Sequence, residues 1–202
     1  ETTTKEDMTK IIQNEKLKAA GLVAGPPAKK RPQIIIYEVP TNISENDILY
    51  ALRRQNLEGF DKEKVAEGIE ISHKTGKRNS ETTNWVLNVK SEIRNQLIKQ
   101  GRVYIDWISL KVKDYISVSR CYKCQGYAHV SKYCRMNKDI CGHCAIEGHS
   151  YNTCPNKDTK PKCINCKRTG RNCDHSSRSS ECPMYKIAFL NHVSKLDYGS
   201  DV

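Results

Sequence analysis

The sequence predicts an α+β protein, in which one compact domain is followed by three small modules that have little regular secondary structure and depend on metal ions. Two observations support this expectation. All ten cysteines lie between Cys121 and Cys182, whereas residues 32–118 contain none. Only 37% of the 202 residues are hydrophobic, and the mean hydropathy is -0.70. Very small folding units that are poor in apolar side chains usually need a metal ion or disulfides for stability.

The chain divides into five predicted parts. Residues 1–31 are polar, end in Gly25-Pro26-Pro27-Ala28-Lys29-Lys30-Arg31 and predict a flexible basic segment. A short helix with Met8, Ile11 and Ile12 on one side is the alternative for its first half. The other parts are the compact domain at 32–118, two zinc knuckles at 119–156, a third, irregular zinc knuckle at 157–186, and a tail or short helix at 187–202.

The first half of the compact domain predicts a strand, a helix and a second strand. Residues 34–39 predict a strand that Pro40 ends. Ser44-Glu45-Asn46-Asp47 is a capping pattern, which predicts a helix that begins there. The apolar residues expected on one face of this helix are Ile48, Ala51 and Leu52. Residues 68–73 predict the second strand, and a polar loop follows it.

The second half of the domain predicts a strand, a helix and a last strand. A half-buried strand is indicated by the alternation of Trp85, Leu87 and Val89. Ser91 is expected to cap a helix that stops at Gly101, and the last strand is expected to begin with Val103, Ile105 and Trp107. The order strand, helix, strand, strand, helix, strand is the ferredoxin-like order of RNA-recognition motifs, so we expect an RRM-like domain.

The charge of the chain favours a polyanionic partner. There are 34 basic and 23 acidic side chains, which give a formal net charge of +11. Such a charge suits nucleic acid or, as the alternative, an anionic membrane. No signal peptide is visible, and no apolar run approaches the length of about 18 residues that a membrane span needs. We therefore expect no membrane partner.

Two tandem motifs of the form C-x2-C-x4-H-x4-C predict structural zinc. Their ligand sets are Cys121, Cys124, His129 and Cys134, and then Cys141, Cys144, His149 and Cys154. Three thiolates and one imidazole complete a tetrahedral zinc site and leave no open coordination position. A disulfide framework is the alternative, but it has no use for histidine at a fixed offset. Zinc thiolates imply a reducing compartment, so we expect the cytoplasm, the nucleus or both.

A third, less regular cluster predicts a third zinc ion. Cys163, Cys166, His175 and Cys182 repeat the order of ligand types with longer loops. In the competing assignment Cys173 replaces His175 or Cys182, and in a further alternative the loop binds no metal. The expected cofactor is therefore Zn²⁺, with three ions per chain.

Aromatic and basic side chains near the first knuckle predict binding of single-stranded RNA or DNA. Tyr122 and Tyr127 flank the ligands and could stack on unpaired bases. The basic residues expected to contact phosphates are Arg120, Lys123, Lys132 and Arg135. From 116 to 186 there are 13 basic and five acidic side chains, and this excess survives the charge of three zinc sites. The alternatives are that the tyrosines pack against their own turn, and that the knuckles bind protein.

The segment from Arg120 to Val130, Arg-Cys-Tyr-Lys-Cys-Gln-Gly-Tyr-Ala-His-Val, resembles the first knuckle of Gag-like proteins, the first-open-reading-frame products of insect non-LTR retrotransposons. Ile105-Asp106-Trp107 upstream and Glu181 to Lys186 downstream agree with this resemblance, which covers residues 32–190. It implies binding of the element's RNA, assembly into ribonucleoprotein particles, chaperone activity, and a separate partner protein that carries the reverse transcriptase.

The sequence departs from the family pattern at several positions. Ala128 precedes the first histidine, where retroviral knuckles usually have glycine, and Gly142 takes the place that Tyr122 has in the first knuckle. Ile35 replaces the usual stacking aromatic of an RNA-recognition motif, and alternation turns Trp85 inward. We therefore expect the sheet to serve partner contact or self-association as much as RNA.

The motifs of zinc and nucleotide enzymes are missing from the sequence. A nucleobase deaminase needs H-x-E with P-C-x-x-C, but Ser150 and Tyr151 follow His149 and Lys162 separates Pro161 from Cys163. We therefore expect a binding protein and no enzyme. A host knuckle protein that binds RNA or single-stranded DNA is the rival to a retrotransposon protein.

Overall fold

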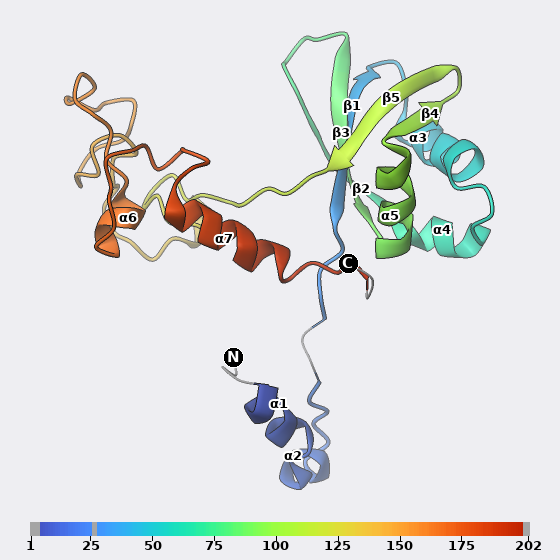
Figure 1. Ribbon diagram of the computed structural model, residues 1–202, viewed down its shortest axis with the longest axis horizontal. Helices are drawn as coiled ribbons and strands as arrows, with labels where there is room; N and C mark the ends of the chain where they lie inside the picture. The colour runs from blue at the N-terminus through green and yellow to red at the C-terminus, as the bar shows by residue number, and fades with distance from the viewer. Residues whose placement is uncertain (1–4, 26–27, 200–202) are drawn as a thin grey trace. The chain divides into compact units, whose positions relative to one another are not determined.

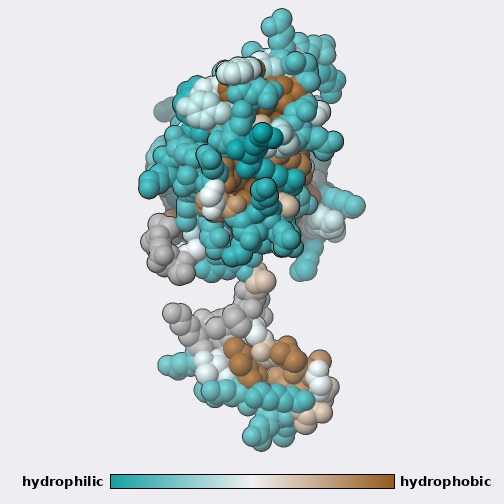
Figure 2. Space-filling view, turned by 90° about the vertical axis from the view of Figure 1, so that its right-hand side faces the viewer, coloured by the Kyte–Doolittle hydropathy of each residue, from teal (hydrophilic) through white to brown (hydrophobic). Residues whose placement is uncertain are grey.

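The computed structural model describes residues 5–25 and 28–199, in two compact units, Glu1–Lys30 and Arg31–Val202. The smaller unit contains helices α1 (Lys5–Ile12) and α2 (Glu15–Ala19). The start of this segment therefore agrees with the alternative of a short helix rather than with a segment that is flexible throughout. Its exposed hydrophobic side chains include Ile11, Leu22 and Val23, and Figure 2 shows brown patches on this unit. Pro26, Pro27 and the side chain of Met8, which the sequence-based expectations used, lie outside the described residues.

A five-stranded antiparallel sheet organises the first part of the larger unit, which we call the sheet domain (residues 31–115). Its strands are β1 (Gln33–Pro40), β2 (Ile69–Thr75), β3 (Thr82–Val89), β4 (Arg102–Ile105) and β5 (Ile108–Asp114). Their order in the sheet is β2-β3-β1-β5-β4 (Figure 1). The pairing is antiparallel throughout, and β1 lies between β3 and β5.

The single last strand that we expected is wrong, because a hairpin occupies its place. Residues 106 and 107 form a turn, and Asp106 has a positive φ of 53°, which breaks the alternation after Ile105. Trp107 is 100% exposed at the tip of this hairpin. Strand β5, and not the strand that begins at Val103, therefore pairs with β1.

The helices of the sheet domain lie on one side of the sheet (Figure 1). Helix α3 (Glu45–Ala51) begins with the predicted capping box of Ser44 and Asp47, and a π-helical turn, η1 (Leu52–Asn56), follows it. The sequence did not predict α4 (Lys62–Gly68), which Asp61 caps. Helix α5 (Ser91–Gln100) ends at Gly101 with a φ of 70°, as expected, but its N-cap is Lys90, so the expected cap at Ser91 is wrong.

A single apolar core fills the space between the sheet and these helices. Ile34 and Ile36 of β1 and Trp85, Leu87 and Val89 of β3 supply the sheet side of this core. The inward direction predicted for Trp85 is confirmed, since its side chain is fully buried. Lys74 Nζ lies 4.0 Å from the centre of the Trp85 ring and covers it at the end of β2.

The opposite face of the sheet has a different character. Ile35 and Val86 are buried but lie outside the core, because they alternate with the inward residues of their strands. His73 pairs with Val86 across β2 and β3, and the ring of Tyr115 packs edge-on against His73 at 5.8 Å. An aromatic pair from β2 and the chain after β5 therefore lies on this face.

The remaining chain, residues 116–199, contains the ten cysteines, and we call it the cysteine region. A 3-10 turn, η2 (Ser131–Tyr133), lies in its first part, and helices α6 (Ile164–Arg168) and α7 (Pro183–Val193) lie in its last part. The third cluster thus has more regular structure than we expected, and α7 begins before residue 187. None of the helices in the described residues is long and apolar enough to cross a membrane.

Candidate metal centre

The first two clusters have nearly the same backbone, displaced by 20 residues in the sequence. In the first, Cys121 N donates to Gly126 O and Gln125 N donates to Cys121 O, both at 2.8 Å. In the second, the corresponding donors are Cys141 N to Ile146 O at 2.9 Å and Ala145 N to Cys141 O at 3.1 Å. These turns place the two thiols of each C-x2-C pair on the same side, as a metal clamp requires.

Each turn needs residues in the left-handed conformation. Gln125 and Ala145, which follow the second cysteine, have φ values of 61° and 60°. The residue before the histidine is also left-handed, with φ of 69° at Ala128 and 97° at Gly148. This conformation explains the usual glycine before the histidine, since only glycine adopts it without a steric cost.

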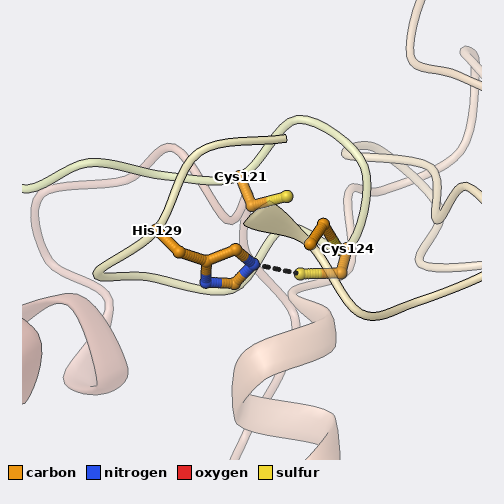
Figure 3. Close-up of side chains that lie close together, drawn as sticks. Cys121, Cys124 and His129 are labelled. Carbon is orange, nitrogen blue, oxygen red and sulfur yellow. Dashed lines mark hydrogen bonds between the residues drawn. The ribbon is translucent and has the colours of Figure 1, made fainter. Parts of the chain in front are cut away.

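In each of the first two clusters the four predicted ligands come together. The ligand atoms of Cys121, Cys124, His129 and Cys134 all lie within 4.8 Å of one another, and so do those of Cys141, Cys144, His149 and Cys154. Figure 3 shows the side chains of Cys121, Cys124 and His129 directed toward one another. Cys124 Sγ and His129 Nε2 are 3.3 Å apart, and the same distance separates Cys144 Sγ from His149 Nε2.

These distances are within about 0.2 Å of those expected between ligand atoms around zinc. With Zn–S of about 2.3 Å and Zn–N of about 2.0 Å, tetrahedral coordination puts neighbouring ligand atoms about 3.5–3.8 Å apart. The other ring nitrogen of His129, Nδ1, lies 3.2 Å from Tyr127 O, a contact that orients the imidazole with Nε2 toward the thiols. In all three clusters the ligand atoms are close enough to one another to bind a metal ion, which is consistent with three zinc ions.

The third cluster brings His175 together with three cysteines. Cys163, Cys166, His175 and Cys182 form the group, with Cys182 Sγ 3.7 Å from Cys163 Sγ and 3.5 Å from Cys166 Sγ. His175 Nε2 lies 3.5 Å from Cys166 Sγ. Cys173 is partly buried beside this group, and its carbonyl accepts from Cys163 N at 2.8 Å. The arrangement favours His175 over Cys173 as the fourth ligand.

One thiol in each cluster is poised to ionise. Desolvation is the largest influence on the pKa of Cys121 and raises it, but hydrogen bonds from the backbone of Cys124 and Lys123 and from neighbouring side chains lower it to about 6. The same balance lowers the pKa of Cys182 to about 6 and that of Cys144 to about 7. Desolvation, followed by the nearby Cys182, instead raises the pKa of Cys163 to about 12. Each cluster thus offers one ready thiolate, and metal binding would release the remaining protons.

Buried polar side chains join the three clusters into one packed unit. Gln125 Nε2 donates to Ile140 O at 2.9 Å and so ties the first cluster to the second. Asn165 Nδ2 donates to Gln125 O at 2.8 Å and ties the third cluster to the first. Ser177 Oγ donates to Gly142 O at 3.4 Å and ties the third to the second. Gln125, Asn165 and Ser177 are only 4%, 7% and 2% exposed, so these links are shielded from water.

The residues predicted to bind nucleic acid fall into two groups. Arg120, Tyr122 and Tyr127 line one pocket, whereas Lys123, Lys132 and Arg135 lie outside its lining. Tyr122 is 74% exposed, but Tyr127 is half-buried, its hydroxyl donates to Ser177 O at 3.1 Å, and its ring packs edge-on against Tyr185. Burial raises the pKa of Tyr127, so its hydroxyl stays a donor. Of the two tyrosines, Tyr122 is therefore the one that presents its ring to solvent.

Several surface residues escaped the sequence analysis. Arg178 lines the same pocket as Arg120 and lies 4.4 Å from the ring centre of Tyr151. Tyr133 is 70% exposed beside Lys132, and Ile146 is 52% exposed on the second cluster. Ile146 lies in a second pocket with three lysines from the third cluster and the segment before it, Lys160, Lys162 and Lys167. Arg178 is distant in the sequence from the first knuckle that it joins in space, whereas Tyr133 and Ile146 lie within the first two knuckle motifs.

The fold and these groups define a mixed α/β protein whose five-stranded antiparallel sheet is followed by three Cys₃His clusters. The chain is similar to an uncharacterized 50 kDa protein in the type I retrotransposable element R1DM of Drosophila melanogaster, with 28% identity over 183 residues. The similarity covers 89% of this chain and 38% of that protein, so the chain spans little more than a third of its relative. No family model and no solved structure matches the chain.

This similarity confirms the resemblance to a retrotransposon protein, and the three Cys/His groups fit a Gag-like protein. In each cluster the four protein ligands would occupy all four coordination positions of a tetrahedral zinc ion and leave none for an activated water. The clusters therefore suit binding better than hydrolysis.

Proposed function

We propose that the chain is a zinc-dependent protein that binds single-stranded nucleic acid, RNA in particular, as a Gag-like component of a retrotransposon ribonucleoprotein. The observation that carries this proposal is the packing of three Cys₃His clusters into one unit whose surface presents basic side chains and exposed tyrosines. We assign the zinc ligands to the twelve residues of the three groups described above.

The surface chemistry supports a single strand. Tyr122 and Tyr133 expose most of their rings, with Arg120 and Lys132 5.6 and 5.7 Å from the respective ring centres. Such aromatic and basic pairs can stack an unpaired base and contact the phosphate beside it. Lys123 and Arg135 add positive charge to the same cluster. Bases within a duplex are already stacked on one another, so the tyrosines would have little access to them.

Titration of the zinc-loaded chain with labelled oligouridine, followed by fluorescence anisotropy, tests this function. Saturable binding that weakens steeply with salt is the expected result, because Lys and Arg release counterions from phosphates. Addition of a zinc chelator should abolish it. Tight binding that persists without zinc, or none with zinc, contradicts the proposal.

We also propose that the sheet domain is RRM-like and serves self-association. The strand order β2-β3-β1-β5, with two crossover segments on one face, supports the RRM-like assignment. Strand β4 ends the sheet and carries Tyr104, which is 53% exposed, beside the fully exposed Trp107. An edge strand with exposed aromatic side chains is suited to pairing with a second copy.

Light scattering of the full chain and of Trp107→Lys tests self-association. The wild-type chain should form dimers or larger species whose mass falls with dilution, and Trp107→Lys should be monomeric at the same concentration. A monomeric wild-type chain contradicts this role. A partner that carries the reverse transcriptase follows from the resemblance, and residence in the cytoplasm or nucleus follows from the reducing compartment that zinc thiolates imply.

A further inference from the structure

Side chains of the first and third clusters line an open pocket of about 400 Å³. Its inner wall is formed by Ser177, Tyr127 and Tyr185, which hold one another in place through the bond from the Tyr127 hydroxyl to Ser177 O and the contact of the two rings. Tyr122 lines it with a ring that is 74% exposed. Both the size and the mixture of aromatic and polar walls are typical of sites for small ligands.

The pocket has an unbalanced positive charge. Arg120 and Arg178 both line it, and none of its lining residues is acidic. Among the described residues neither guanidinium forms a salt bridge, and the two are close enough to repel each other. Arg120 is held by Ser177, to whose Oγ its Nη1 donates at 3.4 Å. Two partly fixed guanidiniums without a carboxylate favour an anion with several oxygens.

We propose that this pocket binds one nucleotide of a single-stranded RNA, with its phosphate between Arg120 and Arg178 and its base stacked on Tyr122. This inference rests on the function proposed above and adds the third cluster to the binding surface. Arg178 and Ser177 belong to the third cluster, whereas Arg120 and Tyr122 belong to the first. The site therefore exists only when both clusters are folded against each other.

Two arginines on the same cluster allow a matched test. Arg178→Gln removes one charge inside the pocket, and Arg168→Gln removes one charge from α6, outside the pocket lining. With a 12-residue oligouridine, R178Q should lower the affinity of the zinc-loaded full chain about tenfold, and R168Q should change it less than threefold. Native mass spectrometry should still find three zinc ions in each variant. If R178Q loses zinc, the same affinity comparison is made with Arg178→Lys, which keeps the charge but loses the planar guanidinium.

An abasic strand of the same length distinguishes the contribution of the phosphate to binding from that of the base. R178Q should weaken binding of the abasic strand as much as binding of oligouridine, and Tyr122→Ala should weaken only oligouridine. Equal effects of R178Q and R168Q would overturn the pocket but leave the proposed function intact. A wild-type chain that does not bind oligouridine would overturn both.

Discussion

The sheet domain and the cysteine region are stabilised by different means. In the sheet domain 18 buried residues form one continuous apolar cluster. In the cysteine region the buried apolar residues are mostly the cysteines themselves, and the others are Ile140, Ala145 and Leu196. One half of the chain should therefore fold by apolar burial and the other only with metal, although both belong to the same compact unit.

Removal of zinc tests this contrast with the largest expected effect. Structural zinc contributes on the order of 10 kcal/mol to the folding of small finger domains at neutral pH. A chelator should therefore abolish the hydrogen-exchange protection of residues 119–186 and leave that of residues 33–114 in place. Loss of protection in both regions would mean that the sheet domain depends on the clusters.

His175→Ala should remove one of the three zinc ions, because it leaves the third cluster with three ligands. Cys173→Ser is the matched control and should retain all three, since Cys173 lies beside the group and outside it. Native mass spectrometry counts the ions directly. If Cys173→Ser loses the ion and His175→Ala keeps it, the ligand assignment must be exchanged.

Trp85→Ala should destabilise the sheet domain and leave the cysteine region unchanged. The Trp85 ring is fully buried in the core, so its loss should destabilise the sheet domain by about 3–5 kcal/mol. The change should appear in denaturant unfolding of the sheet domain, and the zinc count should stay at three. A loss of zinc in this variant would show that the two regions fold as one.

Tyr122→Ala should weaken binding of single-stranded RNA by about 1–3 kcal/mol without altering zinc content. The control is Tyr104→Ala, which removes a tyrosine that is 53% exposed on the sheet domain. Anisotropy titrations should find the Tyr104 variant close to wild type. Equal losses in both variants would assign RNA binding to both regions.

The smallest effect is expected at the left-handed residue before each histidine. Ala128→Gly relieves a conformation that costs alanine about 1–2 kcal/mol, offset in part by the entropy of glycine in the unfolded chain. The net gain should be up to about 1 kcal/mol and should raise the thermal unfolding temperature of the zinc-loaded chain. Gly148→Ala is the reverse test and should lower that temperature. Its new Cβ would meet no atom within 4 Å, so any loss would come from the left-handed backbone and not from a clash.

The patterns that were predictable from sequence are those with a fixed spacing. Alternation along β3 predicted the buried Trp85, and ligand spacing predicted the two regular clusters. The β4–β5 hairpin was not predictable, because the left-handed conformation of Asp106 interrupts an alternation that otherwise continues to Trp107. Helix α4 is short and buries only Val65 and Gly68, so it has almost no apolar period to detect.

The contacts between clusters escaped prediction for another physical reason. Gln125, Asn165 and Ser177 are polar, and polar residues in a loop are normally assigned to the surface. Their burial arises only when backbone carbonyls from another cluster come within hydrogen-bonding distance. Arg178 likewise joins Arg120 only through the fold, 58 residues away in the chain.

If the chain binds nucleic acid as proposed, the buried amide of Gln125 has a consequence for the length of strand that one chain can cover. Knuckles on flexible linkers would occupy variable stretches of a strand, because each could move independently. Here the first and second clusters are joined both by Gln125 and by the bond from Ile140 N to Lys123 O at 2.7 Å, which fixes the distance between their surfaces. The number of nucleotides occupied per chain would then be constant, and successive chains would be evenly spaced along an RNA.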